Sequence, residues 1–306
     1  MYNILGIIYM DTNHMHEAEE ALKASLDIRL RRTEGDPEWI EREIAVVYNS
    51  LGNLYYLQDM LNEAEQAHKS ALEIRERLYA ANPGALALTL GSSYKNLGVV
   101  YDEMSMFEKS AELNAAARDL FEKHASADPE QYKELAAQCG VNLGVTYAKM
   151  GRFDESEEYF ESALEIHQRL AENNPNEYEY RVAEAYLAYG EALHRANRRE
   201  ASLEKYRMAQ TMFAKLAVYS PDAFEPLLAD CHAGVAGLYK EMGRVTDDPC
   251  HSPNASTVPC QEMVCIYPCV CACTGARPRA AGSNPRERCG RKPMDRQVVR
   301  ERSYER

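Results

Sequence analysis

The chain of 306 residues lacks an apolar run of the roughly 20 residues needed to span a bilayer. It also lacks a basic excess, because Asp and Glu outnumber Lys and Arg by 48 to 35 and the net charge is −13. Clustered Lys and Arg are what bind a nucleic-acid backbone or an anionic membrane surface. The composition therefore disfavours nucleic acids and membranes as partners.

Motifs typical of catalysis are missing as well. The sequence contains no G-x-x-x-x-G-K-[ST] phosphate loop, no H-E-x-x-H zinc motif and no G-x-S-x-G nucleophile turn. Its one close histidine pair, His14 and His16, is spaced i, i+2, a spacing that does not share a helix face. We therefore expect neither an active site nor a cofactor.

Cysteine is scarce in residues 1–244, where only Cys139 and Cys231 occur. The first residues, Met1-Tyr2-Asn3-Ile4, lack the basic start of a secretory signal. Two isolated cysteines fit a reducing compartment, where cysteine acts as a small buried apolar residue. We therefore expect a cytoplasmic protein.

What the sequence does contain is a repeat of 46 residues, marked by two sets of residues that keep this step. The glycines are Gly6, Gly52, Gly98, Gly144 and Gly190, with Ala236 in the sixth place, and the prolines are Pro37, Pro83, Pro129, Pro175 and Pro221. A fixed period of about 20 to 50 residues is typical of stacked repeat proteins. Such a protein offers a long binding surface rather than an active site.

Each unit has two apolar runs at helical spacing. The sequence Leu-Gly-x-x-Tyr surrounds the first four glycines, and small residues follow, as Ala64 and Ala71 follow Gly52. A glycine inside a helix costs about 1 kcal/mol relative to Ala, so its recurrence indicates that a neighbouring helix approaches its backbone closely. Each repeated proline follows a residue suited to cap a helix, which predicts a helix boundary there. Pro226 leaves open whether the long helix starts at Pro221 or several residues later.

This pattern resembles the tetratricopeptide repeat family, whose signature is W-x2-L-G-x2-Y…A-x3-F…P in about 34 residues. The resemblance covers residues 1–244, although the unit is longer and tyrosine replaces tryptophan, as at Tyr48 and Tyr94. The longer unit is similar to kinesin-light-chain-type and bacterial arrays. The resemblance implies an all-α, right-handed superhelical α-solenoid of antiparallel helix pairs, with about five and a half units in residues 1–244.

The resemblance also implies a concave groove, lined by the first helix of each unit, that binds a peptide or protein segment. The side chains that would face the ligand are Asn3, Asn49, Asn53, Lys95, Asn96, Asn142, Glu191 and His194. An asparagine amide both donates and accepts, so it can pair with a peptide backbone; alternatively, these asparagines only cap helices or face water. The function predicted is an interaction scaffold. The alternative is a fragment of a larger signalling or regulatory protein whose effector domain is missing.

The repeat stops abruptly after Arg244. Residues 245–306 contain seven of the nine cysteines and ten Lys and Arg, without a helical period. Three interpretations stay open: a segment that is not native coding sequence, a disordered extension, or a metal-binding tail. The candidate metal ligands are Cys265, Cys269, Cys271 and Cys273, whose spacing suits one tetrahedral zinc site poorly.

The break leaves the sixth unit with its first helix alone. Terminal units of a repeat array normally need a polar outer face. We therefore expect an exposed apolar strip near Leu227, Leu228, Val235 and Leu238, and self-association through this uncapped helix.

Overall fold

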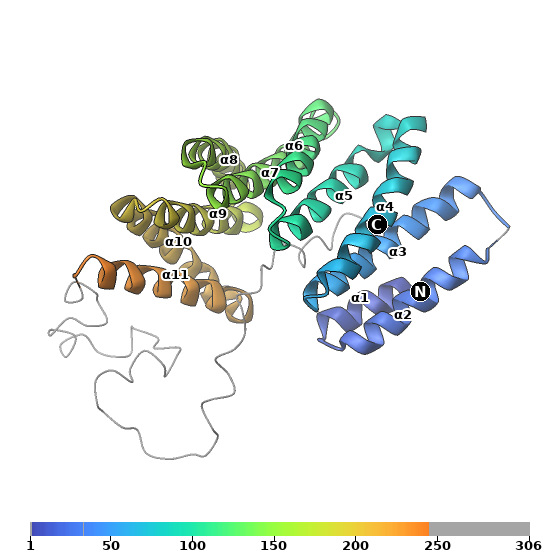
Figure 1. The fold of residues 1–306 in the computed structure, drawn as a ribbon, viewed down its shortest axis with the longest axis horizontal. Helices are drawn as coiled ribbons and strands as arrows, with labels where there is room; N and C mark the ends of the chain where they lie inside the picture. Colours follow the sequence, from blue (N-terminus) through green and yellow to red (C-terminus); the bar gives the residue numbers. More distant parts are fainter. Residues whose placement is uncertain (1, 33, 245–306) are drawn as a thin grey trace, which may run out of the picture.

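A computed structural model describes residues 2–32 and 34–244, which form eleven α-helices and no strand (Figure 1). The first helices of the units are α1 (Tyr2–Asp11), α3 (Pro37–Leu57), α5 (Pro83–Glu103), α7 (Pro129–Lys149), α9 (Pro175–Arg195) and α11 (Pro221–Glu241). The second helices are α2 (Met15–Leu30), α4 (Leu61–Ala81), α6 (Phe107–His124), α8 (Phe153–Asn173) and α10 (Arg199–Tyr219). The predicted all-α solenoid is confirmed. The expectations for the cysteine-rich tail lie outside the described residues.

The repeated prolines are the first residues of α3, α5, α7, α9 and α11, as the sequence predicts. Asp36 and Asp128 cap two of these helices by accepting hydrogen bonds from the backbone N–H of Glu38 at 3.1 Å and of Gln131 at 3.2 Å. Pro226 lies inside α11, so this helix starts at Pro221 and the later start is wrong.

The turn that follows the first helix of each unit contains one residue with left-handed backbone. These residues follow the repeated glycine, or Ala236, by seven positions, and they are Asn13, Asp59, Ser105, Gly151, Asn197 and Gly243, with φ between 59° and 76°. A single left-handed residue ends a helix and reverses the chain. The second helix of each unit therefore runs back antiparallel to the first.

Each repeated glycine makes room for a side chain of the second helix in its own unit. These side chains follow the glycine by 16 residues and are Leu22, His68, Asn114, Phe160 and Tyr206. A Cβ added at Gly144 would lie 2.8 Å from the Phe160 ring, closer than carbon atoms pack. The close approach that the sequence indicates at these glycines is confirmed.

Replacing Gly144 by Ala is expected to lower the free energy of unfolding by about 1–3 kcal/mol, because the added methyl group overpacks the Phe160 contact. Gly237 in α11 is the matched control, since nothing lies within 4 Å of an added Cβ there. Gly237→Ala is expected to raise the free energy of unfolding by up to about 1 kcal/mol through helix propensity. Urea unfolding of both variants measures this, and a shift in the same direction would contradict the packing explanation.

Successive odd-numbered helices contact one another, whereas no comparable contact joins successive even-numbered helices in the described part of the chain. The helices of successive units therefore lie closer together on the side of the odd-numbered helices than on the side of the even-numbered helices. We call these the inner face and the outer face. The array curves continuously from α1 to α11 (Figure 1).

The apolar strip expected on the last helix is absent. Leu228, Val235 and Leu238 are buried and Leu227 is partly buried, because α11 turns its apolar side onto α10. The prediction of a strip at these positions is wrong, and self-association through it loses its basis. Large apolar side chains are exposed instead at the end of α10, at Val218 and Tyr219, and on the first two helices, at Tyr2, Ile4, Ile8, Ile28 and Leu30.

Candidate functional site on the inner face

All eight side chains predicted to face a ligand lie on odd-numbered helices. Asn3 is on α1, Asn49 and Asn53 are on α3, Lys95 and Asn96 are on α5, Asn142 is on α7, and Glu191 and His194 are on α9. The exposure of these side chains differs widely. Lys95 and Asn96 are each 5% exposed, whereas Glu191 is exposed to solvent. The helices that carry the candidates form one face, but the side chains are not equally available on it.

Three of the five candidate asparagines, Asn49, Asn96 and Asn142, form hydrogen bonds with asparagine side chains. Asn96 Nδ2 donates to Asn49 Oδ1 at 3.1 Å, which links α5 to α3. Asn142 Nδ2 donates to Asn114 Oδ1 at 3.1 Å, and Asn114 is the side chain that fills the space beside Gly98. These amides therefore join units to one another.

Asn3 and Asn53 are in a different position. The Oδ1 atoms of both are buried without a hydrogen-bond partner. A buried acceptor without a donor costs about 1–3 kcal/mol. Both oxygens lie on the inner helices, on α1 and α3, respectively.

A buried polar chain, which we call the inner ladder, connects α5, α7 and α9. Lys95 Nζ donates to Gln138 Oε1 at 2.7 Å, and Gln138 Nε2 donates to Glu134. Arg181 Nε lies 3.0 Å from Glu134 Oε1, as an ion pair rather than an aligned hydrogen bond, and Arg181 Nη1 lies 3.3 Å from Glu184 Oε2. Lys95 is thus held inside the array. Sequence reasoning missed Glu134 and Arg181, because neither position keeps its residue type from unit to unit.

His194 belongs to a polar contact between consecutive units. Its Nε2 lies 3.0 Å from Glu241 Oε1 on α11, and Arg199 Nε lies 3.2 Å from the other Glu241 oxygen. These two hydrogen-bond donors lower the pKa of the Glu241 carboxyl group. The same repeat positions are joined two units earlier, where Lys149 pairs with Asp102.

The described residues offer little for covalent or metal chemistry. No group of three or more His, Cys, Asp or Glu in residues 2–32 and 34–244 is arranged to hold a metal ion. Cys139 and Cys231 are buried free thiols, and burial raises the pKa of the Cys231 thiol, which keeps it protonated. None of the helices in the same ranges has the length and apolar character needed to cross a membrane.

Stacked antiparallel helix pairs with a polar inner face define an α-solenoid of the helical repeat class. The family model described as tetratricopeptide repeat matches residues 1–77 and 135–215, together just over half of the chain. The chain therefore belongs to the tetratricopeptide repeat family. No curated protein matches the sequence significantly.

Solved structures share the fold at low sequence identity. BtubC (BKLC) from P. vanneervenii is 18% identical, with a TM-score of 0.59 over 87% of this chain and 94% of that one. The Rap conjugation gene regulator of plasmid pLS20, in complex with the Phr* peptide, is 16% identical, with a TM-score of 0.54 over 81% and 71%. A signal transduction ATPase with a tetratricopeptide repeat sensor, from Pyrococcus horikoshii, is 17% identical, with a TM-score of 0.56 over 81% and 34%.

Proposed function

We propose that this protein is an interaction scaffold that binds a peptide or an extended protein segment along its inner face, without catalysis. The observation that carries the proposal is the continuous face of odd-numbered helices, which contact one another along the whole array. The peptide complex of the pLS20 Rap regulator, which has the same fold, supports a peptide as the ligand. A cytoplasmic location stays a prediction.

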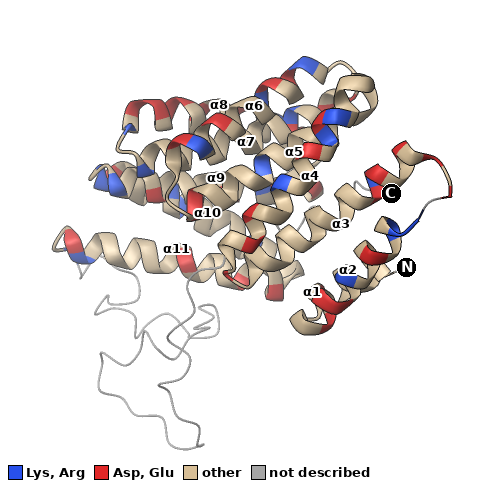
Figure 2. Cartoon of the chain, turned by 45° about the vertical axis from the view of Figure 1, so that its right-hand side comes forward, with Lys and Arg blue, Asp and Glu red and all other residues tan. Residues whose placement is uncertain are grey.

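Charge favours a basic ligand. Residues 1–244 contain 41 Asp and Glu against 25 Lys and Arg, and Figure 2 shows acidic residues, in red, distributed along the array. Complementary charge raises the rate of association and selects among partners. On the inner face, Glu191 supplies an exposed carboxylate, and Asn53 supplies an amide oxygen that lacks a donor.

The proposal is tested with peptides selected from a random display library on the full-length protein. The double variant Asn53→Ala/Glu191→Ala is expected to bind the selected peptides at least about tenfold more weakly, which corresponds to about 1.4 kcal/mol. Glu165→Ala is the control, because its side chain is 72% exposed on α8 and lies away from the inner helices. Equal binding by wild type and the double variant would contradict the inner face as the site.

A second candidate is a sensor segment of a larger signalling or regulatory protein. The Pyrococcus ATPase favours it, because this chain spans only 34% of that protein, whose repeats are described as its sensor. An immunoblot of the native protein separates the two candidates. A species much larger than the 34.6 kDa of this chain supports the sensor, and a species of 34.6 kDa opposes it.

A further inference from the structure

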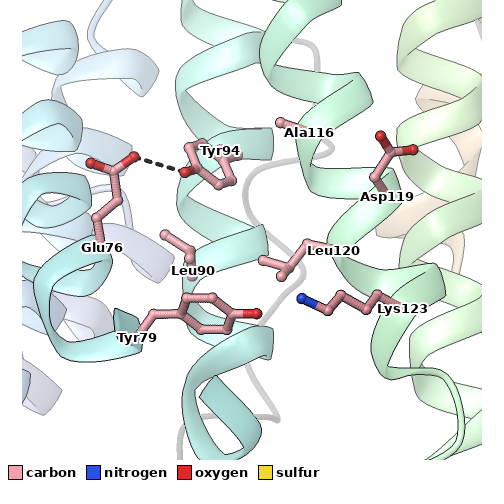
Figure 3. A pocket seen from close by; sticks show the side chains of 8 residues that line it. All are labelled: Glu76, Tyr79, Leu90, Tyr94, Ala116, Asp119, Leu120 and Lys123. Atoms are coloured by element: carbon pink, nitrogen blue, oxygen red, sulfur yellow. Dashed lines mark hydrogen bonds between the residues drawn. The ribbon is translucent and has the colours of Figure 1, made fainter. Parts of the chain in front are cut away.

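The outer face carries a pocket of about 520 Å³ between α4 and α6, with α5 as its floor (Figure 3). Leu90 and Leu120 form its apolar surface, and the side chains of Tyr79 and Tyr94 line it. Two carboxylates, Glu76 and Asp119, approach it from opposite sides in Figure 3. Apolar walls with a few polar groups are typical of binding pockets of this size.

The pocket follows from one residue that departs from the repeat. Tyr79 takes a position that is Ala125, Ala171 and Ala217 in the next three units. Its hydroxyl lies 3.0 Å from His124 Nε2 on α6, so the side chain bridges the two outer helices. An alanine at this position leaves room for the two outer helices to pack closer together, whereas a tyrosine fills that space. The Tyr79 side chain also closes one end of the pocket.

Two units later, the equivalent tyrosine has two partners that the pocket lacks. Tyr186 corresponds to Tyr94. Gln168 donates to the Tyr186 hydroxyl at 2.6 Å, and Lys205 Nζ lies 5.7 Å from the centre of the Tyr186 ring. This distance is within the range of a cation–π contact.

At Tyr94 in the pocket, other residues replace both partners of Tyr186. Glu76 replaces the glutamine, and Tyr94 donates to it at 2.7 Å. Leu113 replaces Lys205, so the chain supplies no cation there. Lys123 also lines the pocket, and in Figure 3 its amino group points toward the Tyr79 hydroxyl rather than toward Glu76 or the Tyr94 ring. A carboxylate and an open aromatic ring without a cation form an acceptor for a cation from outside.

Arginine fits this acceptor better than lysine. Its planar group pairs with carboxylates and stacks on aromatic rings, while its apolar stem covers hydrophobic surface. The chain uses the same arrangement internally, where the Arg152 guanidinium lies 4.3 Å from the centre of the Tyr147 ring. The net negative charge of residues 1–244 would attract such a ligand.

We propose that this pocket binds an arginine side chain of a protein partner, with its stem on Leu90 and Leu120 and its guanidinium over Tyr94, between Glu76 and Asp119. This surface lies on the outer face and is separate from the proposed inner site. The protein would therefore hold two partners, or two segments of one partner, at the same time.

The test is an NMR titration of the full-length protein with the acetylated, amidated tripeptide Ala-Arg-Ala. Glu76→Gln is expected to weaken binding about 3- to 10-fold, since it removes the charge next to the cation. This variant is expected to keep the fold, because Gln168 at the equivalent position forms a hydrogen bond with the hydroxyl of Tyr186. Lys123→Gln is expected to strengthen binding, since it removes a like charge from the rim.

Two controls separate the pocket from general attraction to an acidic protein. Glu165→Gln removes the same charge from an exposed site on α8 and is expected to leave binding unchanged. A tripeptide with citrulline in place of arginine keeps the shape without the charge and is expected to bind little. Equal weakening by Glu76→Gln and Glu165→Gln, or equal binding of the two peptides, would overturn the proposal. Neither result depends on the inner face.

Discussion

Lowering the pH from 7 to 5 is expected to reduce the free energy of unfolding by about 4 kcal/mol through two histidines alone. His68 and His167 are each 1% exposed, and burial lowers the pKa of each to about 3. The charges of Arg75 and Arg181 add to the shift at His68 and His167, respectively. Both histidines are therefore neutral in the folded protein at pH 5.

The sign follows from the unfolded chain, where a histidine has a pKa of about 6.5. Below that value the unfolded state binds protons that the folded state does not bind. The stability is fully present above pH 6.5 and is lost progressively as the pH falls toward 3. At pH 5 each histidine contributes a loss of about 2 kcal/mol, at about 1.36 kcal/mol per pH unit.

The repeat itself supplies the control variants. Leu22 in the first unit takes the position of His68 in the second unit. Phe121 and Phe213, in the units before and after, take the position of His167. The variant His68→Leu/His167→Phe should thus pack well and lose most of the pH dependence between 7 and 5. Urea unfolding of both proteins at the two pH values measures the difference. A double variant with the wild-type pH dependence would assign the effect to other groups.

Glu134→Leu is expected to lower the free energy of unfolding by about 3–5 kcal/mol, because it leaves the Arg181 guanidinium in a buried place without its closest carboxylate. The side chains of Arg181 and Glu134 are 9% and 10% exposed. Replacing both should cost much less, since a buried ion pair is worth little more than well-packed apolar residues. Leu88 and Leu135 occupy the equivalent places in other units, so Glu134→Leu/Arg181→Leu is a matched double variant.

A double-mutant cycle on these two residues, followed by urea unfolding, gives the coupling free energy directly. We expect a coupling of about 2 kcal/mol or more. Additive losses in the double variant would show that the two charges are stabilised separately, for example by Glu184 and Gln138, which also contact them.

The period predicts the architecture because its markers act locally. A proline after a capping residue starts a helix wherever it occurs, and the five repeated prolines do so. A glycine that recurs at one helical position in five successive units has a packing cause, and Gly144 against Phe160 shows it. Both effects depend on residues within one unit, so a single sequence suffices to predict them.

The inner face could not be predicted in the same way. The burial of Lys95 and Asn96 depends on how closely α5 approaches α7 and α3, and the period does not encode that distance. The residue types of the inner ladder change from unit to unit, as Glu134 corresponds to Leu88 and Arg42, so no pattern marks it. The strip expected at Leu228 and Val235 failed because a lone helix has one apolar side, and α11 uses it against α10.

The contacts between consecutive units also make the order of the units matter. Asp102 of unit 3 meets Lys149 of unit 4, whereas His194 of unit 5 meets Glu241 of the following helix. The acidic member comes first in one pair and second in the other. A chain in which unit 4 followed unit 5 would place Lys149 beside His194, two groups of the same sign when the histidine is protonated. Recombination that shuffles or duplicates these units would therefore mismatch their junctions, although every unit shares the same helical framework.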